Sequence, residues 1–161
     1  MRASLAAAAV VVLLGVAAAC SASSSACFRT CPPLQGAWQV TFEPATDPAD
    51  CQKINATLPD GELDITQQSS QLTATFQGHA LAGTAFDTGD FALDGQDVPD
   101  GGGLDAFSFR GFYAGPAAAA ADAGQSDGGR LSGTYDATLQ RPGAQGTVTC
   151  RQVRSYAATR R

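Results

Sequence analysis

The chain contains a series of short stretches in which apolar and polar residues alternate, and turn-forming residues separate one stretch from the next. A period of two is typical of β-strands with one buried face. The first stretch places Trp38, Val40 and Phe42 on one face, and the last does the same with Cys150 and Gln152. The alternation predicts a run of strands. They cover residues 36–43, 62–67, 71–77, 80–86, 90–93, 106–113, 130–139 and 146–153.

Most connections between these strands are too short to hold a crossover helix, so consecutive strands should pair antiparallel. About eight antiparallel strands in sequence order favour an all-β fold: an up-and-down barrel whose first and last strands meet. A two-sheet β-sandwich is the alternative. No segment has a convincing helical stripe, although Ala117–Ala121 offers a turn of helix within a stretch that we interpret as a loop.

The N-terminus has the pattern of an export signal. It begins with a positive charge at Arg2, and the run Leu5–Ala19 contains no charged residue and no proline. This run is shorter than the ~20 residues that a membrane-spanning helix needs. It matches the apolar region of a secretory signal, with small residues just before Cys20. We therefore expect residues 1–19 to be a signal peptide.

The segment Ala17-Ala18-Ala19-Cys20 resembles the lipobox of bacterial lipoproteins, with Ala17 where Leu is usual. The resemblance implies cleavage before Cys20 and acylation of this residue. It also implies a lipid-anchored place in the bacterial cell envelope, and Ser21 resembles an outer-membrane sorting signal. Cleavage by the ordinary signal peptidase, or a retained membrane anchor, are the alternatives. The expected organisation is a signal (1–19), a lipidated cysteine with a Ser-rich tether (20–26), one β domain (27–156) and a basic tail (157–161).

Four cysteines remain if Cys20 is lipidated. They allow three pairings, of which we favour Cys27–Cys31 together with Cys51–Cys150. A zinc site is the alternative, although the spacing of the first two cysteines departs from the C-x2-C pairs of such sites. Disulfides matter here because large apolar side chains are few: aromatic residues make up 7% of the chain. A small core gains more from a covalent staple than a large one.

The residues Gly36-Ala37-Trp38, at the start of the first predicted strand, resemble the Gly-x-Trp of lipocalins and their calycin relatives. In that family an arginine from the last strand packs over the tryptophan. The resemblance therefore implies a barrel in which Arg151 or Arg154 covers Trp38. It also implies a ligand site, because barrel mouths commonly bind small molecules.

The charge balance and the polar residues mark few candidate sites. Fifteen acidic and ten basic residues give a net charge of −5, which argues against a nucleic-acid-binding surface. The single histidine, His79, lies between two predicted strands and is expected to be an exposed turn residue. Six aspartates occur in a run without any basic residue: Asp87, Asp90, Asp94, Asp97, Asp100 and Asp105. They offer the oxygen ligands that calcium prefers, but their spacing fits no calcium loop, so we interpret them as a solvated hairpin.

No arrangement of residues marks a catalytic centre, and we assign no catalytic residue, cofactor or metal ligand. We expect a non-catalytic binding module of the cell envelope, held on the membrane by its lipid. Its partner would be a small apolar ligand or another envelope protein, and not a nucleic acid. The alternative is a structural or interaction lipoprotein with no small ligand.

Overall fold

The computed structural model describes residues 25–28, 30–115, 128–144 and 146–161. The expected signal peptide, Cys20, the tether up to residue 24 and Ala117–Ala121 lie outside the described residues. The strands are β1 (Gly36–Phe42), β2 (Gly61–Gln68), β3 (Gln71–Phe76), β4 (His79–Ala85), β5 (Asp90–Asp97), β6 (Asp105–Ala114), β7 (Arg130–Gly143) and β8 (Gly146–Arg160). One short helix, α1 (Ala49–Lys53), follows β1. No helix in these ranges has the length and apolar character needed to cross a membrane.

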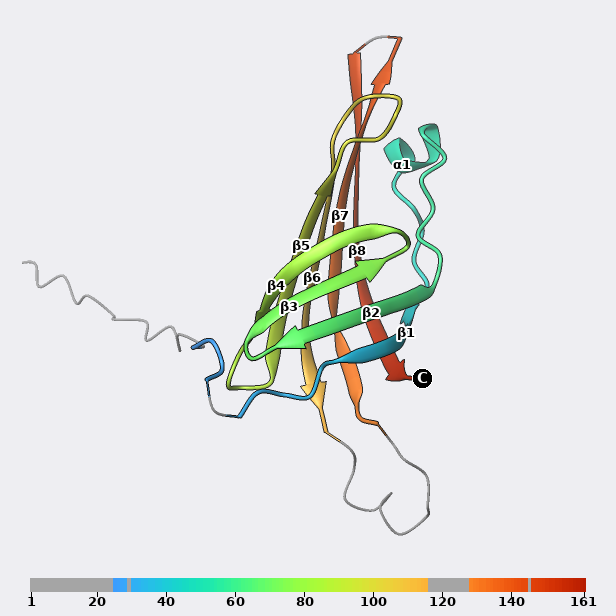
Figure 1. Cartoon of the computed structure of the whole chain (residues 1–161). Coiled ribbons are helices and arrows are strands. Elements are labelled where there is room, and N and C mark those ends of the chain that lie inside the picture. Colours follow the sequence, from blue (N-terminus) through green and yellow to red (C-terminus); the bar gives the residue numbers. More distant parts are fainter. Residues whose placement is uncertain (1–24, 29, 116–127, 145) are drawn as a thin grey trace, which may run out of the picture.

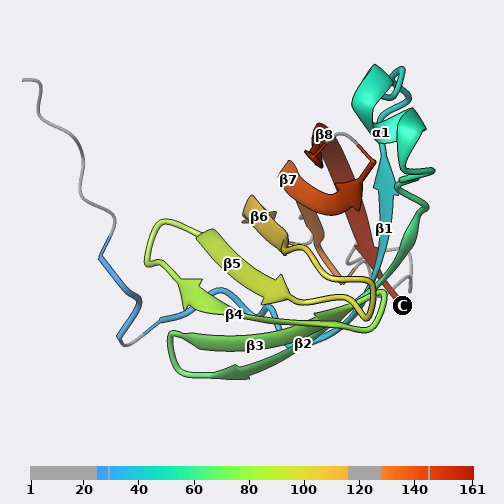
Figure 2. The ribbon, with the colours of Figure 1, turned by 90° about the horizontal axis from the view of Figure 1, so that it is seen from above.

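The eight strands form a closed antiparallel barrel in the order of the sequence. Each strand pairs with the next, and β8 pairs with β1 to close the ring. Figure 2 shows the strands following one another around this ring. Figure 1 shows β2 to β4 crossing β5 to β8 at a steep angle. The up-and-down barrel predicted from the sequence is confirmed, and the β-sandwich is excluded.

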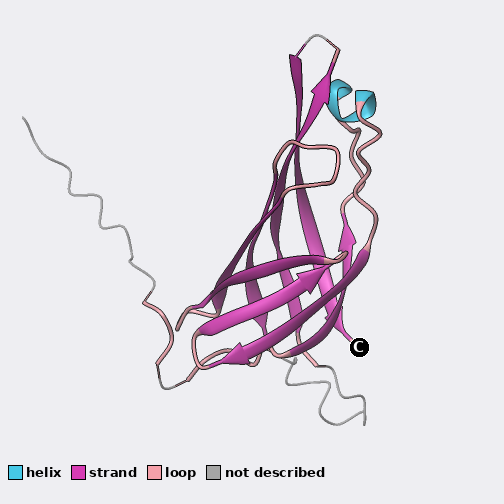
Figure 3. Ribbon diagram, turned by 45° about the horizontal axis from the view of Figure 1, so that its top comes forward, coloured by secondary structure: helices cyan, strands magenta, loops and turns pink. Residues whose placement is uncertain are grey.

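The two ends of the barrel differ. At one end, which we call the floor, the segment 25–35 lies beside the β2–β3 and β4–β5 turns. At the other end, which we call the mouth, the β1–β2 connection (43–60) with α1 and the β5–β6 loop (98–104) stand above the strands (Figures 1 and 3). The hairpin of β7 and β8 also projects beyond the neighbouring strands at the mouth (Figure 3).

Aromatic side chains fill the middle of the barrel. Their ring centroids lie 4.6 to 6.5 Å apart, mostly edge-to-face or tilted. The cluster consists of Phe42, Phe76, Phe109, Tyr135 and Tyr156. All but Tyr156 belong to the face that the alternating pattern assigns to the interior, and Tyr156 lies beyond the predicted strand, in phase with the buried Cys150 and Gln152. Gly111 makes room for it, since a Cβ there would lie 2.3 Å from the hydroxyl oxygen of Tyr156.

The floor is closed around Trp38, the only tryptophan of the chain and fully buried. Its indole Nε1 donates a hydrogen bond to the carbonyl oxygen of Leu34, at 2.8 Å. The guanidinium carbon of Arg160 lies 4.7 Å from the centre of the indole ring. The same guanidinium donates hydrogen bonds to the carbonyl oxygens of Pro33 and Gln35. Arg160, near the C-terminus, therefore links the floor segment before β1 to the buried indole ring of Trp38.

The expectation that Arg151 or Arg154 covers Trp38 is wrong. Arg151 points to the outer face, because it alternates with the inward-facing Cys150 and Gln152, and it pairs with Asp136. Arg154 faces the mouth, where it donates a hydrogen bond to Asp47. Antiparallel pairing sets Trp38 opposite Arg160, near the end of β8. β8 is also longer than expected. Residues 157–160, which were predicted to be part of a basic tail, pair with β1.

The two disulfides favoured from the sequence, Cys27–Cys31 and Cys51–Cys150, are both present, which removes the zinc alternative for these cysteines. Cys51 lies on α1, which the sequence did not predict because five residues are too few to display a helical stripe. The bond to Cys150 holds α1 against β8, beyond the point where β1 pairs with that strand. The helix thereby covers an otherwise open strand edge.

We expect the two disulfides to contribute unequally to stability. In the chain-entropy model, a bridge that spans 99 residues contributes about 4–5 kcal/mol, and one that spans four residues contributes about 2 kcal/mol. Urea unfolding of Cys51→Ala/Cys150→Ala should therefore give a lower free energy of unfolding than Cys27→Ala/Cys31→Ala, by about 2–3 kcal/mol. Equal losses in the two double variants would contradict this account.

Arg160→Met should destabilise the barrel by about 2–3 kcal/mol, because it removes the cation–π contact and the charged hydrogen bonds to the floor segment. The matched control is Arg151→Met on the same strand, whose exposed ion pair with Asp136 should matter little. Circular dichroism during urea unfolding measures both. A loss in the control as large as that in Arg160→Met would show that the position of the arginine is unimportant.

Candidate functional site

A cavity of about 250 Å³ opens at the mouth, between the upper ends of the barrel strands and the β1–β2 connection. The segment Ile54–Leu58 lines it from outside the barrel. Apolar walls come from Leu58, Phe107 and Leu139. Its polar groups come from the inward faces of four strands: His79 on β4, Asp105 on β6, Tyr135 and Arg141 on β7, and Gln152 on β8. A small cavity with convergent polar groups is the usual form of a ligand site.

Asp105 and Arg141 form the principal charged pair of the mouth. Asp105 is only 4% exposed, and both of its carboxylate oxygens accept hydrogen bonds from Arg141. The distance from Arg141 Nη2 to Asp105 Oδ2 is 2.8 Å. The hydrogen bond to Asp105 is also the main reason why the pKa of Arg141 is raised. A two-pronged pair of this kind offsets the cost of burying the carboxylate and fixes both side chains.

Tyr135 stands between this pair and the aromatic cluster. Its side chain is almost completely buried, with its ring 4.6 Å from that of Phe109, centroid to centroid. Burial, and to a lesser degree the charge of Asp105, raises the pKa of Tyr135 well above its ordinary value near 10. The phenol therefore stays neutral at physiological pH and keeps a proton to donate. It marks the inner end of the mouth cavity.

Polar side chains inside the barrel hold the β1–β2 connection over the mouth. Gln152 Nε2 donates to Asp47 Oδ1 at 3.0 Å and to the carbonyl oxygen of Ala56 at 3.4 Å. Arg154 Nη2 donates to the same Asp47 oxygen at 2.8 Å. From the turn between β3 and β4, Gln77 donates to the carbonyl oxygen of Pro59. These bonds, together with the packing of Leu58 against the core, fix the outer wall of the cavity.

His79 is not the exposed turn residue expected from the sequence. It begins β4 and is half-buried at the mouth, where its ring lies 4.3 Å from the ring of Phe107. Its Nδ1 atom lies 3.3 Å from a carboxylate oxygen of Asp97. In the described part of the chain, this nitrogen is buried without a hydrogen-bond partner of good geometry. The imidazole thus adds a flat apolar surface and a polar edge to the site.

The six aspartates of the acidic run are spread over the barrel. Asp94 faces outward and pairs with Arg110, Asp90 accepts a hydrogen bond from Thr88, and Asp105 faces inward to Arg141. Asp90 and Asp94 share the outer face of β5, whereas Asp97 lies beside His79 and Asp105 is buried at the mouth. No group of three or more acidic, histidine or cysteine side chains among the described residues is placed to hold a metal ion.

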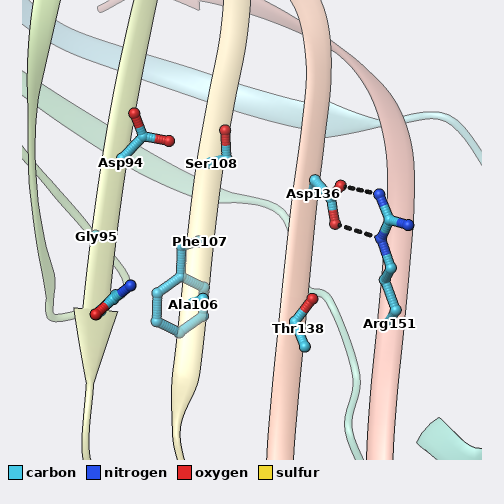
Figure 4. Close-up of a pocket in the computed structure, with 9 residues that line it drawn as sticks. Asp94, Gly95, Ala106, Phe107, Ser108, Asp136, Thr138 and Arg151 are labelled. Atoms are coloured by element: carbon cyan, nitrogen blue, oxygen red, sulfur yellow. Dashed lines mark hydrogen bonds and ion pairs between the residues drawn. The ribbon is translucent and has the colours of Figure 1, made fainter.

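A second depression lies on the outer face of β5 to β8 (Figure 4). Two rows of side chains cross these strands, and the small residues Ala106 and Ser108 leave the hollow between longer neighbours. Figure 4 shows Asp136 and Arg151 joined by two hydrogen bonds, and Asp94 is paired with Arg110. The charged side chains of this depression are already paired with neighbouring side chains, and the depression lies on the outer surface of the barrel. The mouth is therefore the stronger candidate for a ligand site.

Sequence analysis named His79, Asp105 and Gln152 but did not place them at one site or pair Asp105 with Arg141, although a signal was present. Asp105 shares the phase of Phe107 and Phe109, and Arg141 shares that of Tyr135 and Leu139. A charged residue in phase with a buried face must find a partner inside the fold. The pairing of Asp105 with Leu139 in the β6–β7 register brings the two charges together, and that register is not visible in the sequence.

Comparison of the chain with protein-family models gave no matching family, and comparison with curated proteins gave no matching relative. The architecture is nonetheless consistent with a lipocalin-like barrel: a closed ring of eight antiparallel strands, with a Gly-x-Trp at the start of the first and an arginine of the last strand over the indole.

We expect the stability of the barrel to fall steeply above about pH 10. Burial raises the pKa values of Tyr135 and Tyr156 above the ordinary value of 10.0, so only the unfolded chain releases these protons just above that pH. Their contribution is complete below pH 10 and declines as pH rises towards the folded pKa values. Two such groups give a slope of up to about 2.7 kcal/mol per pH unit. Urea unfolding at pH 8 to 11.5 measures the slope.

Tyr135→Phe should roughly halve this slope, since one of the two buried phenols is then absent. An unchanged slope in this variant would assign the alkaline destabilisation to other groups.

Proposed function

We propose that the protein is an exported, lipid-anchored and non-catalytic binding module whose ligand site is the mouth of the barrel. The observation that carries the proposal is the mouth cavity itself. The middle of the barrel is filled by aromatic rings, whereas the mouth leaves about 250 Å³ beside the buried pair of Asp105 and Arg141. A fold that needed only stability would gain by filling this space and removing its charges.

The cavity favours a small ligand that carries hydrogen-bonding groups. Phe107 and Leu139 offer apolar contact, while Tyr135, His79 and the Arg141 guanidinium offer polar atoms. An apolar ligand, as expected from the barrel resemblance alone, would leave the buried Nδ1 of His79 unpaired at a cost of about 1–3 kcal/mol. A compact molecule with an apolar part and a polar end fits both halves of the lining.

The absence of a catalytic role rests on how the polar groups are used. Both carboxylate oxygens of Asp105 accept hydrogen bonds from Arg141, so this carboxylate is engaged in holding the guanidinium in place. The pKa of Tyr135 is raised, which makes its phenol a poor acid at neutral pH. These groups are arranged to hold a ligand in place.

The lipid anchor rests on the sequence of residues 17–20, which resembles a lipobox. Two or three acyl chains on Cys20 hold a protein stably on a membrane, where a single chain does so only marginally. The proposed location is therefore the bacterial cell envelope, where the acyl chains hold the protein on a membrane.

A second candidate is an interaction lipoprotein without a small ligand. Val98 and Leu104, both on the β5–β6 loop beside the mouth, are exposed large apolar residues. A partner protein that covered this loop would bury them. In that case the polar groups of the mouth would contact the partner in place of a small molecule.

Filling the mouth tests the ligand site. Ala137 lines the mouth cavity and is buried, so Ala137→Leu should occupy the space needed by a ligand. The matched control is Ala106→Leu, which fills the outer depression with the same side chain. The purified protein is incubated with a protein-free extract of the producing cells and studied by native mass spectrometry. We expect a bound small molecule in the wild type and in the control, and at least about a ten-fold loss in Ala137→Leu.

Circular dichroism checks that both variants are folded. A wild-type spectrum with no bound molecule contradicts the proposed ligand site and favours the interaction lipoprotein. Equal binding by all three proteins would instead exclude the mouth as the site.

A further inference from the structure

The chain leaves the barrel at the floor, beside the β4–β5 turn. Asp87 N donates a hydrogen bond to the carbonyl oxygen of Ser25, at 3.1 Å, and Ala26 forms a bridge with Phe86. Cys27 N donates to the carbonyl oxygen of Ala85, at 3.0 Å. These three links hold the first described residues, Ser25 to Cys27, at the floor end of the barrel.

Two phenylalanines are exposed around this exit. Phe28 is 90% exposed and lies within the short loop that the Cys27–Cys31 disulfide closes. Phe112 is 45% exposed, and its ring lies over Gly89 of the β4–β5 turn, where a Cβ would come within 2.9 Å of it. Both therefore adjoin the turn that holds the exit of the chain. Neither belongs to the core or to the mouth.

The mouth lies at the opposite end of the barrel (Figure 1). The β5–β6 loop with Val98, the helix α1 and the projecting β7–β8 hairpin all stand at that end (Figure 3). From Cys20 to Ser25 an extended chain spans at most about 18 Å. A lipid on Cys20 would hold the floor close to the membrane surface, and the barrel itself would separate the mouth from it.

We propose that the floor is a membrane-facing surface, in which Phe28 and Phe112 insert into the lipid interface while the mouth opens away from the membrane. The proposal rests on the lipid anchor proposed above. Exposed aromatic rings are favoured at the boundary between headgroups and acyl chains, because their apolar area leaves water there. Two such rings would bind a membrane only weakly by themselves. When a lipid anchor already binds the protein to the membrane, these two rings determine how the barrel is oriented on the membrane surface.

The orientation is tested with tryptophan reporters on the full lipidated protein. Phe28→Trp and Phe112→Trp place a reporter at the floor, and Val98→Trp, at a site 69% exposed, is the matched control at the mouth. Trp38 is fully buried and contributes a common background. Each protein is inserted into vesicles of phosphatidylcholine and phosphatidylglycerol whose acyl chains are brominated near the glycerol. We expect the added emission to fall about two-fold for both floor variants and to stay unchanged for Val98→Trp.

The same samples separate failure of the orientation from failure of the anchor. Intact mass spectrometry reports the acyl chains on Cys20, and flotation reports attachment to the vesicles. An acylated protein that floats but shows equal quenching at floor and mouth, or more at the mouth, overturns the orientation and leaves the anchor standing. A chain without acyl groups that does not float overturns the anchor and, with it, the membrane-facing floor.

Discussion

The pairing of β1 with β8 is the constraint on which the rest of the structure depends. It closes the ring, pairs the first strand with the last over residues 38–42 and 156–160, and brings Trp38 opposite Arg160. Arg160 also donates hydrogen bonds to the carbonyl oxygens of Pro33 and Gln35, so the strand that closes the ring also holds the floor segment in place. A chain with so few large apolar residues could not stabilise an open sheet of this length, since one long edge would remain unpaired in water.

Closure also explains why the two ends of the barrel differ. The floor is sealed by a segment that runs directly into β1 and is held by β2, by the end of β4 and by Arg160 of β8, with Trp38 buried at its centre. The mouth is covered by the β1–β2 connection, which is held by Gln152 and Arg154 through polar bonds and by the Cys51–Cys150 bridge. Such a cover stays in place without filling the space beneath it. The cavity beside Asp105 is the result.

Much of the fold was predictable because a period of two fixes which side chains share a face. The inward positions of Trp38, Phe109 and Tyr135 follow from alternation alone, and the antiparallel strand order follows because most connections are too short to hold a crossover helix. The end of β8 was missed because residues 157–160 (Ala-Ala-Thr-Arg) include no large apolar side chain to mark a buried face, and they resemble a solvated tail until β1 pairs with them. The helix α1 was missed because its single turn is held by a disulfide and has no periodic pattern.

The sequence by itself determined the strands, their two faces and the number of cysteines available for bridges, because these depend on local chemistry and on the geometry of an extended chain. Only the tertiary structure decided which arginine covers Trp38, which carboxylate Arg141 binds, and at which end a cavity remains. Those outcomes depend on register, and register is set by contacts between residues far apart in the chain. A shift of two residues would keep every side chain on its own face and still change every partner.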